Sequence, residues 1–297
     1  MPSLKQIEAF VWAVRLDSFA DAARRLNVTQ STLSKRIAEF ESGLGGALFV
    51  RSGHRAKPTP LGETILDPSE RMLELHDALC RKADTDRIPT GRVVFGVTEL
   101  VARLWLPGWV AWMRQAYPCI ELEPIVDVSA PLMAGLRSGR IALAVMPALP
   151  VGDHLEAIHL ADVEFALMAS PVLDLPSNPD REALAQLPIL AQSGGSGLTE
   201  RFDAWTMTHG LTIRQSLASN SLVAISELVL AGLGCAFLPV APYADHLSDG
   251  RLVRIEGPLP WPTLPYYLVR QRLSPSRAAS ALHDAIDRHT RNARCRP

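Results

Sequence analysis

The sequence has no long apolar run: none of its 297 residues belongs to a stretch of 18 or more consecutive apolar residues. A membrane-spanning helix needs about 20 such residues, so we expect no transmembrane segment. Lys5, Gln6 and Glu8 interrupt the first residues, which therefore lack the apolar core of a signal peptide. Both absences predict a cytoplasmic protein.

Cysteine is scarce and scattered. Cys80, Cys119, Cys235 and Cys295 are far apart and form no Cys-x-x-Cys pair. Buried, reduced thiols are the expected state, and the eight histidines do not have zinc-ligand spacing. We expect no metal and no cofactor.

Sequence motifs of common enzymes are also missing. No P-loop occurs, and no Gly-x-Gly-x-x-Gly follows a predicted strand. Residues 194–198 read Gly-Gly-Ser-Gly-Leu, with leucine where a nucleophile elbow needs its last glycine. We therefore expect that the protein is not an enzyme.

The net charge is only −1, but it is unevenly distributed. Residues 1–58 carry nine Lys or Arg and five Asp or Glu, a balance of +4, so the remainder carries −5. Such asymmetry is typical of a chain in which one domain meets phosphate and the other does not.

Apolar residues at helical spacing predict three short helices in the basic segment, over 4–16, 19–26 and 30–44. Asn27 lies in the tight turn between the second and third, and asparagine tolerates the left-handed conformation. Two helices joined by such a turn form a helix-turn-helix, whose second helix enters the DNA major groove.

The start of the third predicted helix carries short hydrogen-bonding side chains followed by two cations. Glutamine can bond adenine, serine and threonine reach bases or phosphates, and lysine or arginine pairs with phosphate or guanine. The candidate DNA contacts, including two helix caps, are Ser18, Thr29, Gln30, Ser31, Thr32, Ser34, Lys35 and Arg36. An ordinary solvated helix face is the alternative, which the turn, the caps and the charge bias disfavour.

A β-hairpin wing is expected next. Residues 48–50 are β-prone, Gly53 allows a turn, and the return arm carries Arg55 and Lys57. We expect Arg51, Arg55 and Lys57 to contact DNA phosphates.

The order F…SF..AAR.L..TQS.LS..I..FE..LG..LF.R……TP.G over residues 10–62 resembles the LysR-type transcriptional regulators. Ser31 replaces a frequent proline, and Gly45-Gly46 stand where one glycine is usual; both concern helix ends. The resemblance implies a regulator of promoter double-stranded DNA under the control of a small-molecule effector. It also implies a homodimer that pairs again into a homotetramer.

A long helix is predicted after Thr59-Pro60, an N-cap followed by proline at the first helical position. Its apolar residues follow the spacing of a coiled-coil seam, with Pro68 filling one step: Leu61, Ile65, Met72, Leu75 and Leu79. The family dimerises through this linker helix, whereas packing within the same chain is the alternative. Pro68 predicts a bend near Ile65.

From residue 91 onward, strands alternate with helices, which predicts an α/β sheet that is mainly parallel. The expected strands are 93–97, 120–126, 143–146, 165–169, 188–191, 214–218, 235–238 and 264–270. The expected helices are 100–116, 131–138, 198–209, 222–231 and 276–292.

This half resembles the effector domain of the same family, two α/β lobes like those of periplasmic binding proteins, joined by two crossovers. The expected fold is thus α/β: a winged helix-turn-helix, a linker helix and a two-lobed effector domain. The expected boundaries are 1–58 for the DNA-binding domain, 59–90 for the linker helix and hinge, 91–161 with 267–297 for lobe I, and 162–266 for lobe II.

A ligand of such a fold lies between the lobes, beyond the carboxyl ends of strands. The residues expected there are Thr98, Glu99, Ser129, Pro147, Gln192, Ser193, Gly194 and Asn220. Helix N-termini near these residues would receive a carboxylate, so a carboxylate or amino-acid-like metabolite is expected. Glu99 disfavours a simple anion unless it turns away or binds an amine. Ordinary caps and turns remain the alternative for each residue.

Two other functions fit the sequence less well. Peroxide-sensing relatives use a cysteine pair in the second lobe, whereas Cys235 stands alone there and lies on a predicted core strand. A free-standing binding protein needs a signal peptide and leaves the first sixty residues unexplained.

Overall fold

The computed structural model describes residues 2–50, 56–83, 89–147, 155–211, 215–257, 260–272 and 276–294. The chain begins with the three short helices α1 (Leu4–Arg15), α2 (Phe19–Arg25) and α3 (Gln30–Leu44). Side-chain caps fix their starts, because the Ser18 and Thr29 hydroxyls accept hydrogen bonds from backbone N–H groups three residues on. Asn27 has φ +52°, which confirms the left-handed turn between α2 and α3.

An aromatic cluster holds these helices together. Phe10 of α1 meets Phe40 of α3 and Phe49 edge to face, with both pairs of ring centroids 5.7 Å apart. Val50 N–H donates to the Lys57 carbonyl and Phe49 pairs with Pro58, which forms the base of the expected wing. The tip of the wing, with the predicted contacts Arg51 and Arg55, lies outside the described residues.

The long helix α4 (Pro60–Ala83) leads out of this domain and continues uninterrupted through Pro68. One side of it packs on α1, where Leu73 is buried and Glu70 forms an ion pair with Arg15, Oε1 to Nε 2.9 Å. Its other side leaves apolar side chains in solvent: Leu61, Met72, Leu75 and Leu79.

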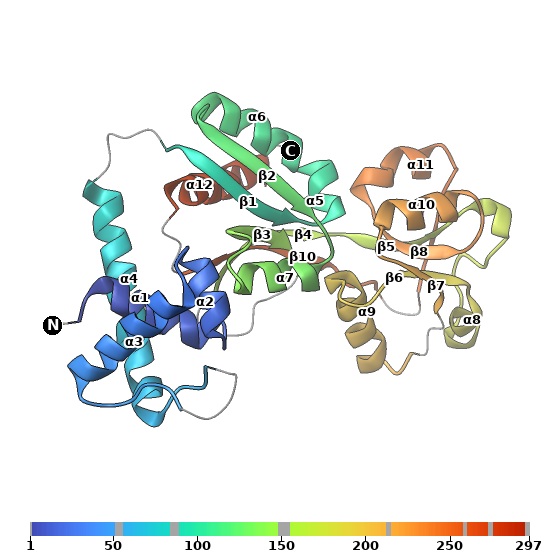
Figure 1. Ribbon diagram of the computed structural model, residues 1–297. Coiled ribbons are helices and arrows are strands. Elements are labelled where there is room, and N and C mark those ends of the chain that lie inside the picture. Colours follow the sequence, from blue (N-terminus) through green and yellow to red (C-terminus); the bar gives the residue numbers. More distant parts are fainter. Residues whose placement is uncertain are drawn as a thin grey trace.

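Two five-stranded sheets follow, at opposite ends of the elongated second half in Figure 1. The first, in the order β2-β1-β3-β10-β4, consists of β1 (Gly91–Val97), β2 (Ile120–Val126), β3 (Leu143–Met146), β4 (Leu155–Val163) and β10 (Leu264–Gln271). Its helices are α5 (Glu99–Leu104), α6 (Leu106–Ala116), α7 (Ser129–Arg137) and α12 (Arg277–Arg294). We call this sheet with its helices lobe I.

Lobe II contains the second sheet, in the order β7-β6-β8-β5-β9. Its strands are β5 (Phe165–Ala169), β6 (Ile189–Gln192), β7 (Gln215–Ser219), β8 (Cys235–Pro239) and β9 (Val253–Ile255). Its helices are η1 (Pro171–Leu173), α8 (Arg181–Gln186), α9 (Gly197–Thr208), α10 (Leu222–Leu230), η2 (Ala241–Tyr243) and α11 (Ala244–Ser248). The chain enters lobe II from β4 through the single residue Glu164 and returns to lobe I along β10.

Three expectations need correction. Both sheets are mixed rather than mainly parallel, since β10 is antiparallel to β3 and β4, and β5 is antiparallel to β8 and β9. The helix expected over 100–116 is two helices that break at Trp105, because Pro107 has no N–H to donate and starts the new helix α6. Strands β4 and β9 were not expected at all. None of the described helices is long and apolar enough to cross a membrane.

Candidate nucleic-acid interface and effector cleft

Helix α3 presents a polar face on the outside of the first domain. Leu33, Ile37 and Phe40 turn inward and are buried. The opposite face exposes five of the predicted contacts, which are Gln30, Ser31, Thr32, Ser34 and Lys35, while Arg36 is half-buried. A short helix with an inward apolar stripe and exposed hydrogen-bonding groups at its N-terminus has the form that enters a major groove.

The remaining predicted contacts differ in how they are held. The Thr29 hydroxyl lies 2.9 Å from the Ser31 hydroxyl and 2.8 Å from that of Thr32, so these three groups form one cluster. Ser18 Oγ accepts the Asp21 N–H and thus acts as a cap. Lys57 is exposed at the base of the wing.

A cleft of about 180 Å³ separates the two lobes. Six of the eight predicted effector residues line it: Thr98, Glu99, Ser129, Pro147, Gln192 and Asn220. Ser193 and Gly194 do not; Ser193 N–H donates to the Ser219 carbonyl instead, and Gly194 is exposed.

Several lining residues were not predicted: Asp127, Ser196, Phe165 and Tyr266. Asp127 directly follows β2, so the rule that ligands lie beyond the carboxyl ends of strands would have found it. Phe165 and Tyr266 come from the strands at the crossovers, which periodicity does not place. Burial raises the pKa of Tyr266 far above its usual value.

Hydrogen bonds between the lobes hold the cleft closed. The Glu99 carboxylate of lobe I accepts from the Ser221 hydroxyl at 2.9 Å and from the backbone N–H groups of Leu222 and Val223, at the start of α10. An acceptor at a helix N-terminus satisfies N–H groups that have no partner within the helix. Glu99 therefore acts as a latch across the two lobes.

A second contact between the lobes joins α7 to α9. Ser129 Oγ accepts the Gly197 N–H at 3.1 Å, and Ala130 N–H donates to the Gly195 carbonyl at 2.9 Å. A Cβ on Gly197 would lie 2.6 Å from the Pro147 carbonyl oxygen and 2.9 Å from Ser129 Oγ. The lobes can approach this closely only because residue 197 has no side chain.

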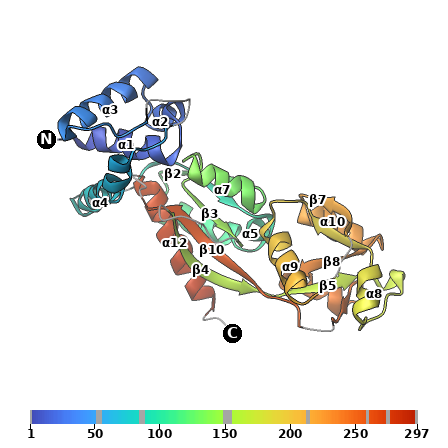
Figure 2. The same ribbon diagram turned by 90° about the horizontal axis from the view of Figure 1, so that it is seen from below.

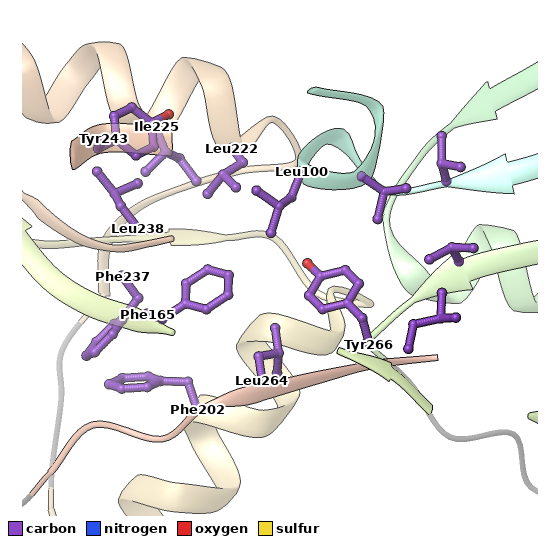
Figure 3. Close-up of a cluster of buried hydrophobic side chains, with 14 of the residues drawn as sticks. Leu100, Phe165, Phe202, Leu222, Ile225, Phe237, Leu238, Tyr243, Leu264 and Tyr266 are labelled. Carbon is purple, nitrogen blue, oxygen red and sulfur yellow. The ribbon is translucent and has the colours of Figure 1, made fainter. Parts of the chain in front are cut away.

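A mainly apolar cavity of about 50 Å³ lies within lobe II, next to the cleft. Its apolar lining is Ile189, Leu190, Ala191, Leu198, Phe202, Leu222, Ile225 and Phe237. Gln192, Leu198 and Leu222 line both this cavity and the cleft. Figure 3 shows the junction, where Leu100 and Tyr266 of lobe I lie across from Leu222 and Phe165.

Neither described cysteine forms a disulfide. Cys235 is buried on β8, and burial raises the pKa of its thiol to about 12. Cys119 is exposed. Among the described residues, no group of three or more His, Cys, Asp or Glu side chains is arranged to hold a metal ion.

Comparison with known proteins agrees with this architecture. Residues 4–63 match the model of the bacterial regulatory helix-turn-helix protein of the lysR family, and residues 87–291 match that of the LysR substrate binding domain. The chain belongs to the LysR family. It is a DNA-binding transcriptional regulator with an effector-binding domain, in a family whose members form oligomers.

Relatives match this chain over most of its length. A probable hydrogen peroxide-inducible genes activator of Mycobacterium avium is 32% identical over 260 residues, which is 84% of this chain and 82% of the relative. The structure of a cysteine mutant of OxyR from Corynebacterium glutamicum is 25% identical, with a TM-score of 0.56, and covers 99% of this chain and 94% of its own. Full-length LysG from Corynebacterium glutamicum, with bound effector Arg, has 21% identity and a TM-score of 0.63 over 98% of both chains.

Proposed function

We propose that this regulator reads promoter DNA with the exposed N-terminal residues of α3 and grips the phosphates with the wing. Gln30 and the hydroxyls of Ser31 and Thr32 supply base contacts, and Lys35 and Lys57 supply positive charge. The excess of basic residues in positions 1–58 supports this assignment, since the remainder of the chain is acidic.

The exposed apolar side of α4 supports a dimer. A monomer would leave Met72, Leu75 and Leu79 in solvent at coiled-coil spacing, and the same face of a second α4 would cover them. Two α3 helices would then address two half-sites, and pairing of two dimers would give a tetramer.

The cleft between the lobes is the effector site of this proposal. The observation that carries it is that both lobes line one polar cavity and bond to each other across it, at Glu99 and at Ser129. A ligand that prefers the closed arrangement shifts the population toward it, by no more than its difference in affinity for the two states.

Two glycines near the start of α9 provide the test. Gly197→Ala introduces a Cβ against Pro147 and Ser129 and should hold the lobes apart, whereas Gly194→Ala meets no atom within 4 Å. Thermal shifts of wild type against a library of metabolites identify a stabilising compound, which at a hundredfold excess over Kd adds about 2.7 kcal/mol. Gly197→Ala should lose that shift and the compound-induced change in the DNA footprint, and Gly194→Ala should keep both. Equal responses in the two variants would refute the cleft as the effector site.

A cysteine-based peroxide response receives no support from the described thiols, although three relatives carry the name of a probable hydrogen peroxide-inducible genes activator. Peroxide attacks the thiolate, and a thiol with a pKa of about 12 holds almost none at neutral pH. Cys235 is also the single cysteine between residues 162 and 266.

A further inference from the structure

Two carboxylates give the cleft negative charge. Glu99 and Asp127 both line it, and none of its described lining residues is Lys, Arg or His. One oxygen of Asp127 accepts the Val128 N–H, and the side chain is only half-buried. An anionic ligand would therefore be repelled by a like charge. A cationic ligand would be attracted to a carboxylate that has no cationic partner among the described lining residues.

The protein already occupies two sets of N–H groups that would otherwise attract an anion. The first N–H groups of α10 donate to Glu99, and the Gly197 N–H at the start of α9 donates to Ser129. A ligand carboxylate could reach the start of α10 only by displacing Glu99 and opening the latch. The structure thus argues against the carboxylate effector that helix N-termini alone suggested.

The apolar cavity in lobe II adds a second requirement. It opens beside the polar cleft, because Gln192, Leu198 and Leu222 line both. Buried aromatic and aliphatic side chains, Phe202, Phe237 and Ile225 among them, form most of its walls. Its polar lining residues are Gln192, Thr199, Asp203, Thr206 and Gln215. A ligand that fills both spaces has a polar end and an apolar end.

We propose that the effector is an organic amine with an apolar chain or ring, whose ammonium group lies beside Asp127 and whose apolar end enters the lobe II cavity. This inference rests on the proposed function, since it assigns the ligand of the same cleft. The hydroxyl and amide groups of Ser196, Gln192 and Asn220 accept the remaining ammonium hydrogens.

Matched probes of one chain length test the sign of the charge. The probes are pentylamine, 1-pentanol and hexanoate, and isothermal calorimetry measures their affinity for the full-length protein. Affinity should fall in that order, with pentylamine at least about tenfold tighter than hexanoate. Each methylene added to the amine should tighten binding about fourfold until the cavity is full.

Three variants locate the charge. Asp127→Asn keeps the acceptor for the Val128 N–H and should weaken pentylamine about tenfold while leaving 1-pentanol unchanged. Glu121→Gln removes an exposed carboxylate from the strand that ends next to Asp127, and it should change neither. Glu99→Ala frees the N–H groups of α10 and should tighten hexanoate relative to wild type.

The outcomes separate the inference from the proposal beneath it. Wild-type protein that binds hexanoate more tightly than pentylamine, or that binds no amine of the series, overturns the inference and leaves the cleft assignment in place. The inference is also overturned if Asp127→Asn does not weaken pentylamine binding. Pentylamine binding that survives Gly197→Ala undiminished would instead count against the cleft itself.

Discussion

Leu75 offers the sharpest test of how this regulator assembles. Its side chain is 64% exposed on α4, between Met72 and Leu79, which are 53% and 59% exposed. Full burial of a leucine contributes about 1.5–3 kcal/mol, so covering the exposed two thirds contributes about 1–2 kcal/mol. In a twofold symmetric dimer each Leu75 is covered once, which doubles the effect to about 2–4 kcal/mol.

Replacing Leu75 with glutamine removes this contribution and keeps a residue with good helix propensity. The dimer dissociation constant should then rise about 30- to 900-fold. Sedimentation velocity over a range of protein concentrations measures that constant, and circular dichroism checks that the fold of the variant is intact. Affinity for a duplex with two half-sites should fall in parallel, with affinity for one half-site unchanged.

Asp67→Asn is the matched control on the same helix. It removes only an exposed i,i+4 ion pair with Arg71, of little energetic value, and lies outside the predicted seam. Its dissociation constant should equal that of wild type. If Leu75→Gln dimerises as tightly as Asp67→Asn, α4 does not form the interface and the exposed leucines need another explanation.

Three further predictions concern DNA reading and thiol chemistry. Lys35→Ala should weaken binding to all DNA sequences and lower the slope of log K against log salt by about 1, and an unaltered slope would remove Lys35 from the phosphate contacts. Gln30→Ala should relax the preference at one base pair by about 1–3 kcal/mol in selection from randomised operators, and an unchanged preference would assign base reading to other residues. Iodoacetamide near neutral pH should alkylate exposed Cys119 in the native protein and Cys235 only after unfolding, since burial holds the Cys235 pKa at about 12. Peptide mass spectrometry measures both sites, and rapid native labelling of Cys235 would contradict its burial.

The sequence predicted the first domain closely because its signals are local. Apolar spacing, the caps Ser18 and Thr29 and the turn at Asn27 all act within a few residues, and α3 has its expected bounds, Gln30–Leu44. Eight of the ten described strands of the second half were also predicted, β2 and β3 with their expected bounds, whereas β4 and β9 were not. The parallel or antiparallel direction of each strand was not predicted, because long-range pairing sets which strands are neighbours.

The difference between local signals and long-range contacts also explains which cleft residues the sequence predicted. Thr98, Ser129 and Asn220 follow strand ends, so a topological rule located them without coordinates. The bonding of Glu99 to α10 is a contact across more than 120 residues, and no local pattern encodes it. The sequence likewise gives no sign that position 197 requires glycine, because the contact of Gly197 with Pro147 is visible only in the structure.

Helix α7 connects the two functional regions of the chain. At its start, Ser129 and Ala130 bond to the α9 loop of lobe II across the cleft. Just beyond its end, Gly139 lies against the Arg25 side chain of α2, so close that a Cβ would be 2.2 Å from Arg25 Nε. The Arg25 guanidinium in turn stacks on Trp12, and desolvation lowers its pKa. Figure 2 shows α7 between α2 and α9. The described structure thus places one nine-residue helix against lobe II at its start and against the DNA-binding domain just beyond its end.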